Sequence, residues 1–139
     1  MRPFHLAFPV HDLKAAKDFY CQILGCGTGR ESPEWVDFNF FGHQITAHLA
    51  NTENGVATNP VDGQAIPIRH FGIILTMQDW QALAKHLETL NIDFKVKPQI
   101  RFRGMAGEQA TLFIADPSGN YLEFKAFNDD RSIFAPEPK

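Results

Sequence analysis

The sequence has few of the features that mark secreted, membrane or disulfide-rich proteins. It contains only two cysteines, Cys21 and Cys26, whose spacing fits neither a disulfide framework nor a CxxC redox motif, so we expect reduced and partly buried thiols. No apolar run approaches the ~20 residues of a membrane-spanning helix, and the N-terminal residues lack the basic-then-apolar layout of a signal peptide. These absences predict a cytoplasmic protein that does not associate with membranes.

An excess of positive charge is also absent. Lys and Arg together number 13 against 16 Asp and Glu, which gives a formal net charge of -3 at pH 7. Binding to a nucleic-acid backbone depends on clustered Lys and Arg, so nucleic acid is not an expected partner. Hydrophobic residues, in contrast, are abundant. They make up 44% of the 139 residues and include 13 Phe. This is enough for one Phe-rich core but too little for two ordinary domains, so we expect a single domain over residues 1–139.

The chain uses one order of elements twice. Each copy begins with a short strand-like run that has His in second position, at Phe4 to Phe8 and at Arg69 to Ile73. A helical pattern follows each run, with apolar residues at spacings of three and four over 13–24 and 80–90. Three β-rich runs follow each helix, near 26–31, 34–41 and 43–49, and near 93–100, 108–115 and 120–127. The repeated unit is therefore βαβββ.

Both predicted helices have recognisable ends. Asp12 is expected to cap the first helix, and Thr76 begins a capping-box pattern that Asp79 completes. Gly25 and Asn91 follow the last apolar residues, and both residue types tolerate the left-handed conformation that ends many helices.

The repeat predicts an α+β fold of two βαβββ modules that form a curved mixed sheet. Module one covers about 1–50, a linker rich in Asn, Gly and Pro covers about 51–67, module two covers about 68–127, and a loose tail covers 128–139. One helix cannot cover both faces of its sheet, so the second face of each module is expected to line a cleft.

Three side chains are predicted to reach that cleft together. If Phe4, Leu6 and Phe8 face the first helix, alternation sends His5 to the opposite face, and the same parity sends His70 there in the second module. In the last strand Leu122 and Phe124 are expected in the core, which leaves Glu123 on the cleft side. A single strand histidine is more often structural, but two at equivalent positions with a carboxylate match the ligand set of non-haem Fe(II) and other divalent sites. We therefore predict His5, His70 and Glu123 as metal ligands.

Two further residues are candidates for catalysis. Thr46 is the strict positional equivalent of Glu123, and His48 lies two residues further along the same side, as either a fourth ligand or an acid or base near the substrate. Tyr121 shares the side of Glu123, either as a phenol for proton transfer or as a strand residue with its tip in water. No residue is assigned to an organic cofactor.

The remaining candidates receive weaker interpretations. The segment from Arg101 to Gln109 is either a flap whose arginines meet an anionic substrate or a solvated hairpin loop. His11 and His43 are interpreted as turn residues and His86 as a solvent-facing helix residue. Asp37 and Asn39 are assigned no role, because neighbouring phenylalanines interrupt the alternation of their strand.

These motifs resemble a known family. The opening from Phe4 to Val10 with Asp12-Leu13, Phe19-Tyr20 and Leu24-Gly25, and the close from Asp116 to Phe124, resemble the glyoxalase/bleomycin-resistance/dioxygenase (vicinal-oxygen-chelate) superfamily. Phe40 to Gln44 and Gly107 to Phe113 are most similar to its small extradiol-dioxygenase-like members. The resemblance covers residues 3–127, implies His5, His70 and Glu123 as ligands, and implies a homodimer that binds a small-molecule substrate.

The chemistry that the resemblance implies starts from a divalent metal that chelates two neighbouring substrate oxygens and stabilises charge on them. Fe(II) and a ring-cleaving dioxygenase acting on a catechol-like compound are favoured. A glyoxalase I-like isomerase or lyase with Ni(II), Zn(II) or Mn(II) is the alternative, although Thr46 and His48 stand where its first-half carboxylate is expected. A metal-free drug-binding protein would not need two cleft histidines and a cleft Glu. A thiol transferase would need a more cationic cleft to bind a phosphonate and a thiolate.

Overall fold

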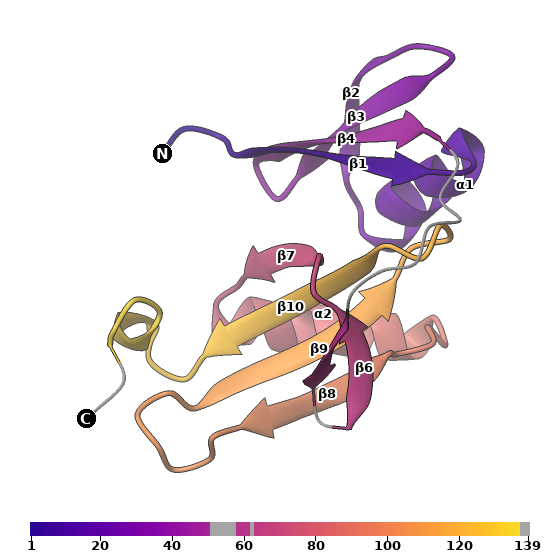
Figure 1. Ribbon diagram of the computed structural model, residues 1–139. Helices are drawn as coiled ribbons and strands as arrows, with labels where there is room; N and C mark the ends of the chain where they lie inside the picture. Colours follow the sequence, from indigo (N-terminus) through magenta and orange to yellow (C-terminus); the bar gives the residue numbers. More distant parts are fainter. Residues whose placement is uncertain (51–57, 62, 137–139) are drawn as a thin grey trace. The chain divides into compact units, whose positions relative to one another are not determined.

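The structure is a computed structural model that describes residues 1–50, 58–61 and 63–136 (Figure 1). The chain divides into two compact units. The first consists of Met1–Gly55 and Asp116–Asn120, and the second of Val56–Ala115 and Tyr121–Lys139. Each unit holds a four-stranded sheet with a helical segment after its first strand, so the predicted α+β fold with two similar modules is confirmed. No helix in these described ranges is long and apolar enough to cross a membrane.

The sheet of the first unit has the order β1-β4-β3-β2. Strand β1 pairs parallel with β4, and the other pairs are antiparallel. The strands are β1 (His5–Val10), β2 (Gly27–Glu31), β3 (Trp35–Phe40) and β4 (His43–Leu49). Phe8, Ile45 and Ala47 are buried as their parity predicts, whereas Phe4 precedes the strand and is exposed.

The helical segment of this unit begins as expected but changes type. Asp12 caps α1 (Leu13–Lys17) by accepting a hydrogen bond from the backbone N–H of Ala15, and Gly25 with φ 76° follows the end. Between them lies a π-helix, η1 (Asp18–Ile23), in which the N–H of Leu24 reaches the carbonyl of Phe19. The apolar spacing indicated a helix, but it carries no information on this wider turn.

A buried tyrosine anchors the Asp116–Asn120 loop within the first unit. Tyr20 is fully buried and its ring packs against Phe8, Phe19 and Phe38. Its hydroxyl donates a hydrogen bond to Asp116 Oδ2 at 2.9 Å. The side-chain amide of Asn120 donates to the carbonyl of Pro9, so the loop is joined to β1 as well.

The sheet of the second unit has the corresponding order β7-β10-β9-β8. Its strands are β7 (Phe71–Ile74), β8 (Val96–Arg101), β9 (Gln109–Ala115) and β10 (Tyr121–Phe127). Helix α2 (Met77–Thr89) lies behind this sheet in Figure 1, with Thr76 as its N-cap and Asn91 at φ 54° after it. Leu122 and Phe124 are fully buried, and Trp80 Nε1 on α2 donates to the carbonyl of Phe124. The alternation predicted for the last strand is therefore confirmed.

The interpretation of 51–67 as a linker is wrong for its second part. Strands β5 (Thr58–Val61) and β6 (Gln64–Pro67) form an antiparallel hairpin, and β6 lies across the face opposite α2 (Figure 1). Ile66 is buried there in a cluster with Val96 and Phe113. The Asn, Gly and Pro composition indicated a loop. Burial of the apolar surface of Val96 and Phe113 under Ile66 favours a strand at this position instead. Residues 51–57 lie outside the described ranges.

The second unit also contains a long hairpin loop and a short C-terminal helix. The loop between β8 and β9 is a hairpin connection in which the N–H of Gly104 donates to Glu108 Oε1. The predicted tail contains a short 3₁₀ helix, η2 (Asp130–Ser132), and Ser132 Oγ donates to the carbonyl of Ala106. Phe134 in the same segment is 94% exposed.

Candidate metal site

His70 and Glu123 meet in the second unit. His70 Nε2 lies 3.4 Å from Glu123 Oε1, and both side chains are largely covered. Oε2 of the same carboxylate accepts a hydrogen bond of 2.6 Å from Thr111 Oγ1 on the neighbouring strand. The structure thus brings together two of the three predicted ligands and adds Thr111 as a residue that holds one of them.

The proton position on His70 follows from its second contact. Nδ1 lies 2.9 Å from the carbonyl oxygen of Pro67. A carbonyl oxygen only accepts, so in the neutral ring Nδ1 carries the hydrogen and Nε2 presents its lone pair toward Glu123. Phe113 packs edge-on against the same ring at 5.1 Å between centroids. The imidazole is therefore held at one nitrogen and packed on one side.

These contacts test whether a metal ion fits. A lone pair and a carboxylate oxygen repel each other unless a cation or a proton lies between them. Two ligand atoms about 2.1 Å from a divalent ion are about 3.4 Å apart at a tetrahedral angle, which matches the observed separation, and about 3.0 Å apart at the right angle of an octahedral ion, which requires a small further approach. The donor atoms of His70 and Glu123 thus fit a divalent ion, and an imidazolium ring is the other species that satisfies the pair.

Gly72 lets the first and last strands of this unit come close. It is paired with Glu123 across the β7–β10 ladder. A Cβ atom at this position would overlap the carbonyl oxygen of Glu123. A glycine two residues after His70 is therefore part of what places the imidazole and the carboxylate side by side.

His5 lies in a different polar cluster in the first unit. Its Nδ1 is 2.8 Å from Gln44 Oε1, and Gln44 Nε2 is 3.5 Å from Asp37 Oδ2. Asp37 Oδ1 accepts a 2.6 Å hydrogen bond from Thr46 Oγ1, and the residues Asp37 and Thr46 are each 5% exposed. No role is predicted for Asp37 from the sequence alone. The pairing of Asp37 with Thr46 would have indicated one, but this register is visible only in the assembled sheet.

His48 and Tyr121 take different surroundings. His48 is exposed and pairs with Pro9, four residues beyond His5 on β1 and therefore about 13 Å along the sheet. Thr46, rather than His48, is the nearer residue to His5 on that face. Tyr121 lies two residues from Glu123 on the same side of β10, and its ring packs against the cluster around Ile66.

The remaining histidines have structural surroundings. His11 Nδ1 lies 2.7 Å from Ser118 Oγ, and His43 Nδ1 accepts a 2.8 Å hydrogen bond from the backbone N–H of Phe4. His86 is exposed on α2. Among residues 1–50, 58–61 and 63–136, no group of three or more His, Cys, Asp and Glu side chains is close enough to hold a metal ion, so His5 as a third ligand stays a prediction.

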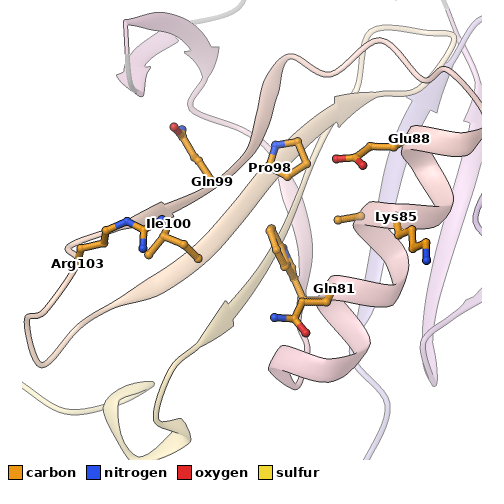
Figure 2. Close-up of a pocket in the computed structure, with 9 residues that line it drawn as sticks. Gln81, Lys85, Glu88, Pro98, Gln99, Ile100 and Arg103 are labelled. Atoms are coloured by element: carbon orange, nitrogen blue, oxygen red, sulfur yellow. The ribbon is translucent and has the colours of Figure 1, made fainter.

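Each unit has a surface hollow, and only the hollow in the first unit is lined by residues of the polar cluster around His5. A hollow of about 530 Å³ lies between α2 and β8, lined by Trp80, Lys85 and Ile100 among others (Figure 2). It is on the helix side of the sheet, whereas Glu123 alternates to the opposite side, so we assign it no part in the site. A hollow of about 400 Å³ in the first unit is lined by Arg30, Asp37 and Gln44, the last of which is the hydrogen-bond partner of His5.

The chain was compared with known proteins. A family model described as Glyoxalase/Bleomycin resistance protein/Dioxygenase superfamily matches residues 2–124. A glyoxalase/bleomycin resistance protein/dioxygenase from Alicyclobacillus acidocaldarius is 37% identical with a TM-score of 0.81, over 95% of this chain and 96% of that one. Among curated proteins no significant match was found.

Two more distant structures share the fold. The fosfomycin resistance protein FosX from Listeria monocytogenes is 14% identical with a TM-score of 0.69, over 96% of this chain and 98% of that one. A lactoylglutathione lyase from Agrobacterium tumefaciens is 18% identical with a TM-score of 0.60, over 88% and 91%. The family match over nearly the whole chain, together with the fold and the repeated modules, shows that this protein belongs to the glyoxalase/bleomycin resistance protein/dioxygenase superfamily.

Proposed function

We propose that the protein is a metal-dependent enzyme that chelates two neighbouring oxygens of a small substrate, with His5, His70 and Glu123 as ligands. The observation that carries the proposal is the 3.4 Å separation of His70 Nε2 from Glu123 Oε1, with Nδ1 of the same ring held by the carbonyl of Pro67. Proteins of this superfamily typically bind a divalent metal. Two imidazoles and one carboxylate favour Fe(II), so our specific proposal is an extradiol-type dioxygenase of a catechol-like compound.

The side chains around the pair have separable tasks in this proposal. When bound, the metal ion supplies stabilisation of negative charge on the substrate oxygens. Thr111 holds one carboxylate oxygen of Glu123 so that the other is directed toward His70. The carbonyl of Pro67 holds His70 from behind. The ring of Phe113, itself buried, packs against one side of the imidazole.

Proton transfer is assigned to Tyr121 first and to His48 second. Tyr121 is two positions from Glu123 on the same strand face, about 7 Å away, within reach of a substrate bound beside the carboxylate. His48 is about 13 Å along its sheet from His5, which makes it the weaker candidate for the same task. Tyr121→Phe is therefore expected to lower kcat more than His48→Gln does.

Metal content is the experiment that decides between the function classes. The protein is purified without chelator or added metal, and its metal content is measured by elemental analysis. The wild type is compared with His5→Ala, His70→Ala and Glu123→Ala. His86→Ala, a change of an exposed histidine on α2, serves as the matched control. We expect near-stoichiometric iron in the wild type and the control, and its loss in the three ligand variants.

Other results would redirect the proposal. Nickel or zinc lost from the same variants would favour a glyoxalase I-like isomerase or lyase, the chemistry named for the lactoylglutathione lyase that shares this fold. No metal in the purified protein and no uptake of added Fe(II) would overturn the proposed enzyme and favour a metal-free binding protein. If iron is present, oxygen consumption with simple catechols tests the specific reaction.

We also propose that the protein works as a homodimer, since proteins of this superfamily commonly form dimers. Light scattering on the purified protein measures the assembly. Mixing His5→Ala with Glu123→Ala subunits then tests where the site is completed. Metal binding regained on mixing would place His5 and Glu123 of one site on different subunits, whereas no gain would place them on the same subunit.

A further inference from the structure

We propose that Gln44 and Asp37 are positioning residues that determine which nitrogen of His5 is available as a ligand. The consequence for metal binding rests on the proposed function, but the effect on the imidazole itself does not. The assignment follows from a hydrogen-bonded series in the first unit that runs from His5 through Gln44 to Asp37.

The amide of Gln44 could face His5 in either of two orientations. An amide has an accepting oxygen and a donating nitrogen that can exchange places by rotation, so a lone contact with His5 would leave the direction of the hydrogen bond open. Here Gln44 Nε2 is 3.5 Å from Asp37 Oδ2. A carboxylate only accepts, so Nε2 must face Asp37 and Oε1 must face the ring of His5.

The orientation of Gln44 determines which nitrogen of the His5 imidazole carries the hydrogen. Gln44 Oε1 is 2.8 Å from His5 Nδ1, so this nitrogen carries the hydrogen in the neutral ring. The lone pair is then on Nε2, the atom directed away from Gln44. Without Asp37, the amide could present its nitrogen to Nδ1 and reverse the two roles.

Asp37 is itself held in place by contacts with its neighbours. Its carboxylate is buried, and Thr46 Oγ1 donates to Oδ1 at 2.6 Å, which leaves Oδ2 for Gln44. Arg30 Nε lies 3.6 Å from Oδ2 and supplies a positive charge to the same oxygen. The group that orients Gln44 is thus held by Thr46 at one oxygen and lies beside the charge of Arg30 at the other.

The second unit reaches the same result with a simpler contact. His70 Nδ1 is directed at the backbone carbonyl of Pro67, an acceptor that cannot rotate into a donor. Both predicted histidine ligands therefore present Nε2. His43 has the opposite arrangement, because its Nδ1 accepts from the backbone N–H of Phe4. The three rings supply an internal comparison within one molecule.

The test uses ¹⁵N NMR of the imidazole rings in metal-free protein at about pH 8.5, above the usual histidine pKa. We expect His5 and His70 with hydrogen on Nδ1 and His43 with hydrogen on Nε2. In Gln44→Leu, which removes the acceptor, His5 should change to a mixture of tautomers. In Gln44→Glu, which loses the donor to Asp37 but keeps an accepting oxygen beside Nδ1, it should remain on Nδ1. Unchanged His70 and His43 signals show that each variant is folded.

Asp37→Asn tests the outer member of the series. An asparagine offers both a donor and an acceptor, so Gln44 loses its required orientation and His5 should show both tautomers. The inference is overturned if His5 in both Gln44→Leu and Asp37→Asn keeps the wild-type pattern. It is overturned equally if wild-type His5 carries its hydrogen on Nε2.

Metal titration separates this inference from the proposed function. Partners that orient a ligating histidine typically contribute about 10- to 100-fold in metal affinity, so we expect that loss in Gln44→Leu and a smaller one in Gln44→Glu. If the wild type binds no divalent ion, the proposed function fails while the NMR result still decides the tautomer. If Gln44→Leu changes the tautomer but binds metal as the wild type does, His5 is not a ligand through Nε2.

Discussion

Thr111 Oγ1 and Glu123 Oε2 lie 2.6 Å apart across the β9–β10 pair, and this hydrogen bond leaves the second carboxylate oxygen facing His70. The first unit contains a similar pair, Thr46 and Asp37, also at 2.6 Å but with the threonine on the last strand and the carboxylate on its neighbour. Each unit therefore places one threonine–carboxylate pair on the face that carries its predicted histidine ligand.

The threonine in the second unit should matter for metal affinity. Thr111→Val keeps the shape of the side chain but removes the donor, so Glu123 is free to rotate and the divalent affinity should fall about tenfold or more. Thr111→Ser keeps the hydroxyl and is the matched control. Isothermal titration with a divalent ion measures both. Equal affinities for the two variants would show that this hydrogen bond does not position the carboxylate.

Gly72 should tolerate no side chain. Gly72→Ala places a Cβ against the carbonyl of Glu123, so β7 must separate from β10, and we expect a loss of at least about 3 kcal/mol in unfolding free energy. Gly27→Ala in β2 is the control, because a Cβ there meets nothing within 4 Å. Urea unfolding of the two variants gives the comparison. A Gly72→Ala protein as stable as Gly27→Ala would contradict the close approach of these strands.

Removing the Tyr20 hydroxyl, which donates to Asp116, should destabilise the protein more at neutral pH than at acidic pH. Burial raises the pKa of Asp116, while hydrogen bonds from Asn120, Tyr20 and Ser118 oppose the rise. Tyr20→Phe removes one donor to the charged carboxylate and should raise that pKa further. The cost should be about 1–2 kcal/mol at pH 7, where the buried carboxyl is ionised, and smaller near pH 4.

The sign of this effect follows from linkage. A folded-state pKa above the unfolded value of about 3.9 means that the protonated carboxyl is favoured on folding. The contribution of the protonated Asp116 carboxyl to the stability of the fold is present below the pKa of the unfolded state and is lost as the pH rises through the pKa of the folded state. Urea unfolding at both pH values measures it, with Tyr121→Phe as the tyrosine control. A Tyr20→Phe cost that is larger at the lower pH would contradict this account.

Both thiols should react slowly in the folded protein. Burial raises the pKa of Cys26 to about 11, and burial is also the main cause that raises the pKa of Cys21. The thiolate is the reactive form, so for Cys26 a disulfide reagent at about pH 8 should react about 100-fold more slowly than with an unfolded thiol. Reaction in native buffer and in urea gives the ratio. A thiol that reacts at the unfolded rate would show that it is accessible and ionised.

Much of the fold was predictable because the signals are local. Asp12 and Thr76 cap their helices as expected, and Leu122 and Phe124 are buried with Glu123 on the other face. Capping depends on a few adjacent residues, and strand alternation depends on a period of two, so a single sequence carries both. The β5–β6 hairpin was missed, because its turn composition is equally typical of a linker and its burial depends on a distant sheet face.

The sequence by itself determined the repeated βαβββ order, the two histidines that begin the repeats, and the side of the last strand on which Glu123 lies. Only the tertiary structure decided that Thr111 holds Glu123 and that Gln44, oriented by Asp37, holds His5. The reason is physical. Which residues alternate is a property of each strand, whereas which residues touch across strands depends on the pairing register, and that is set only when the whole sheet assembles.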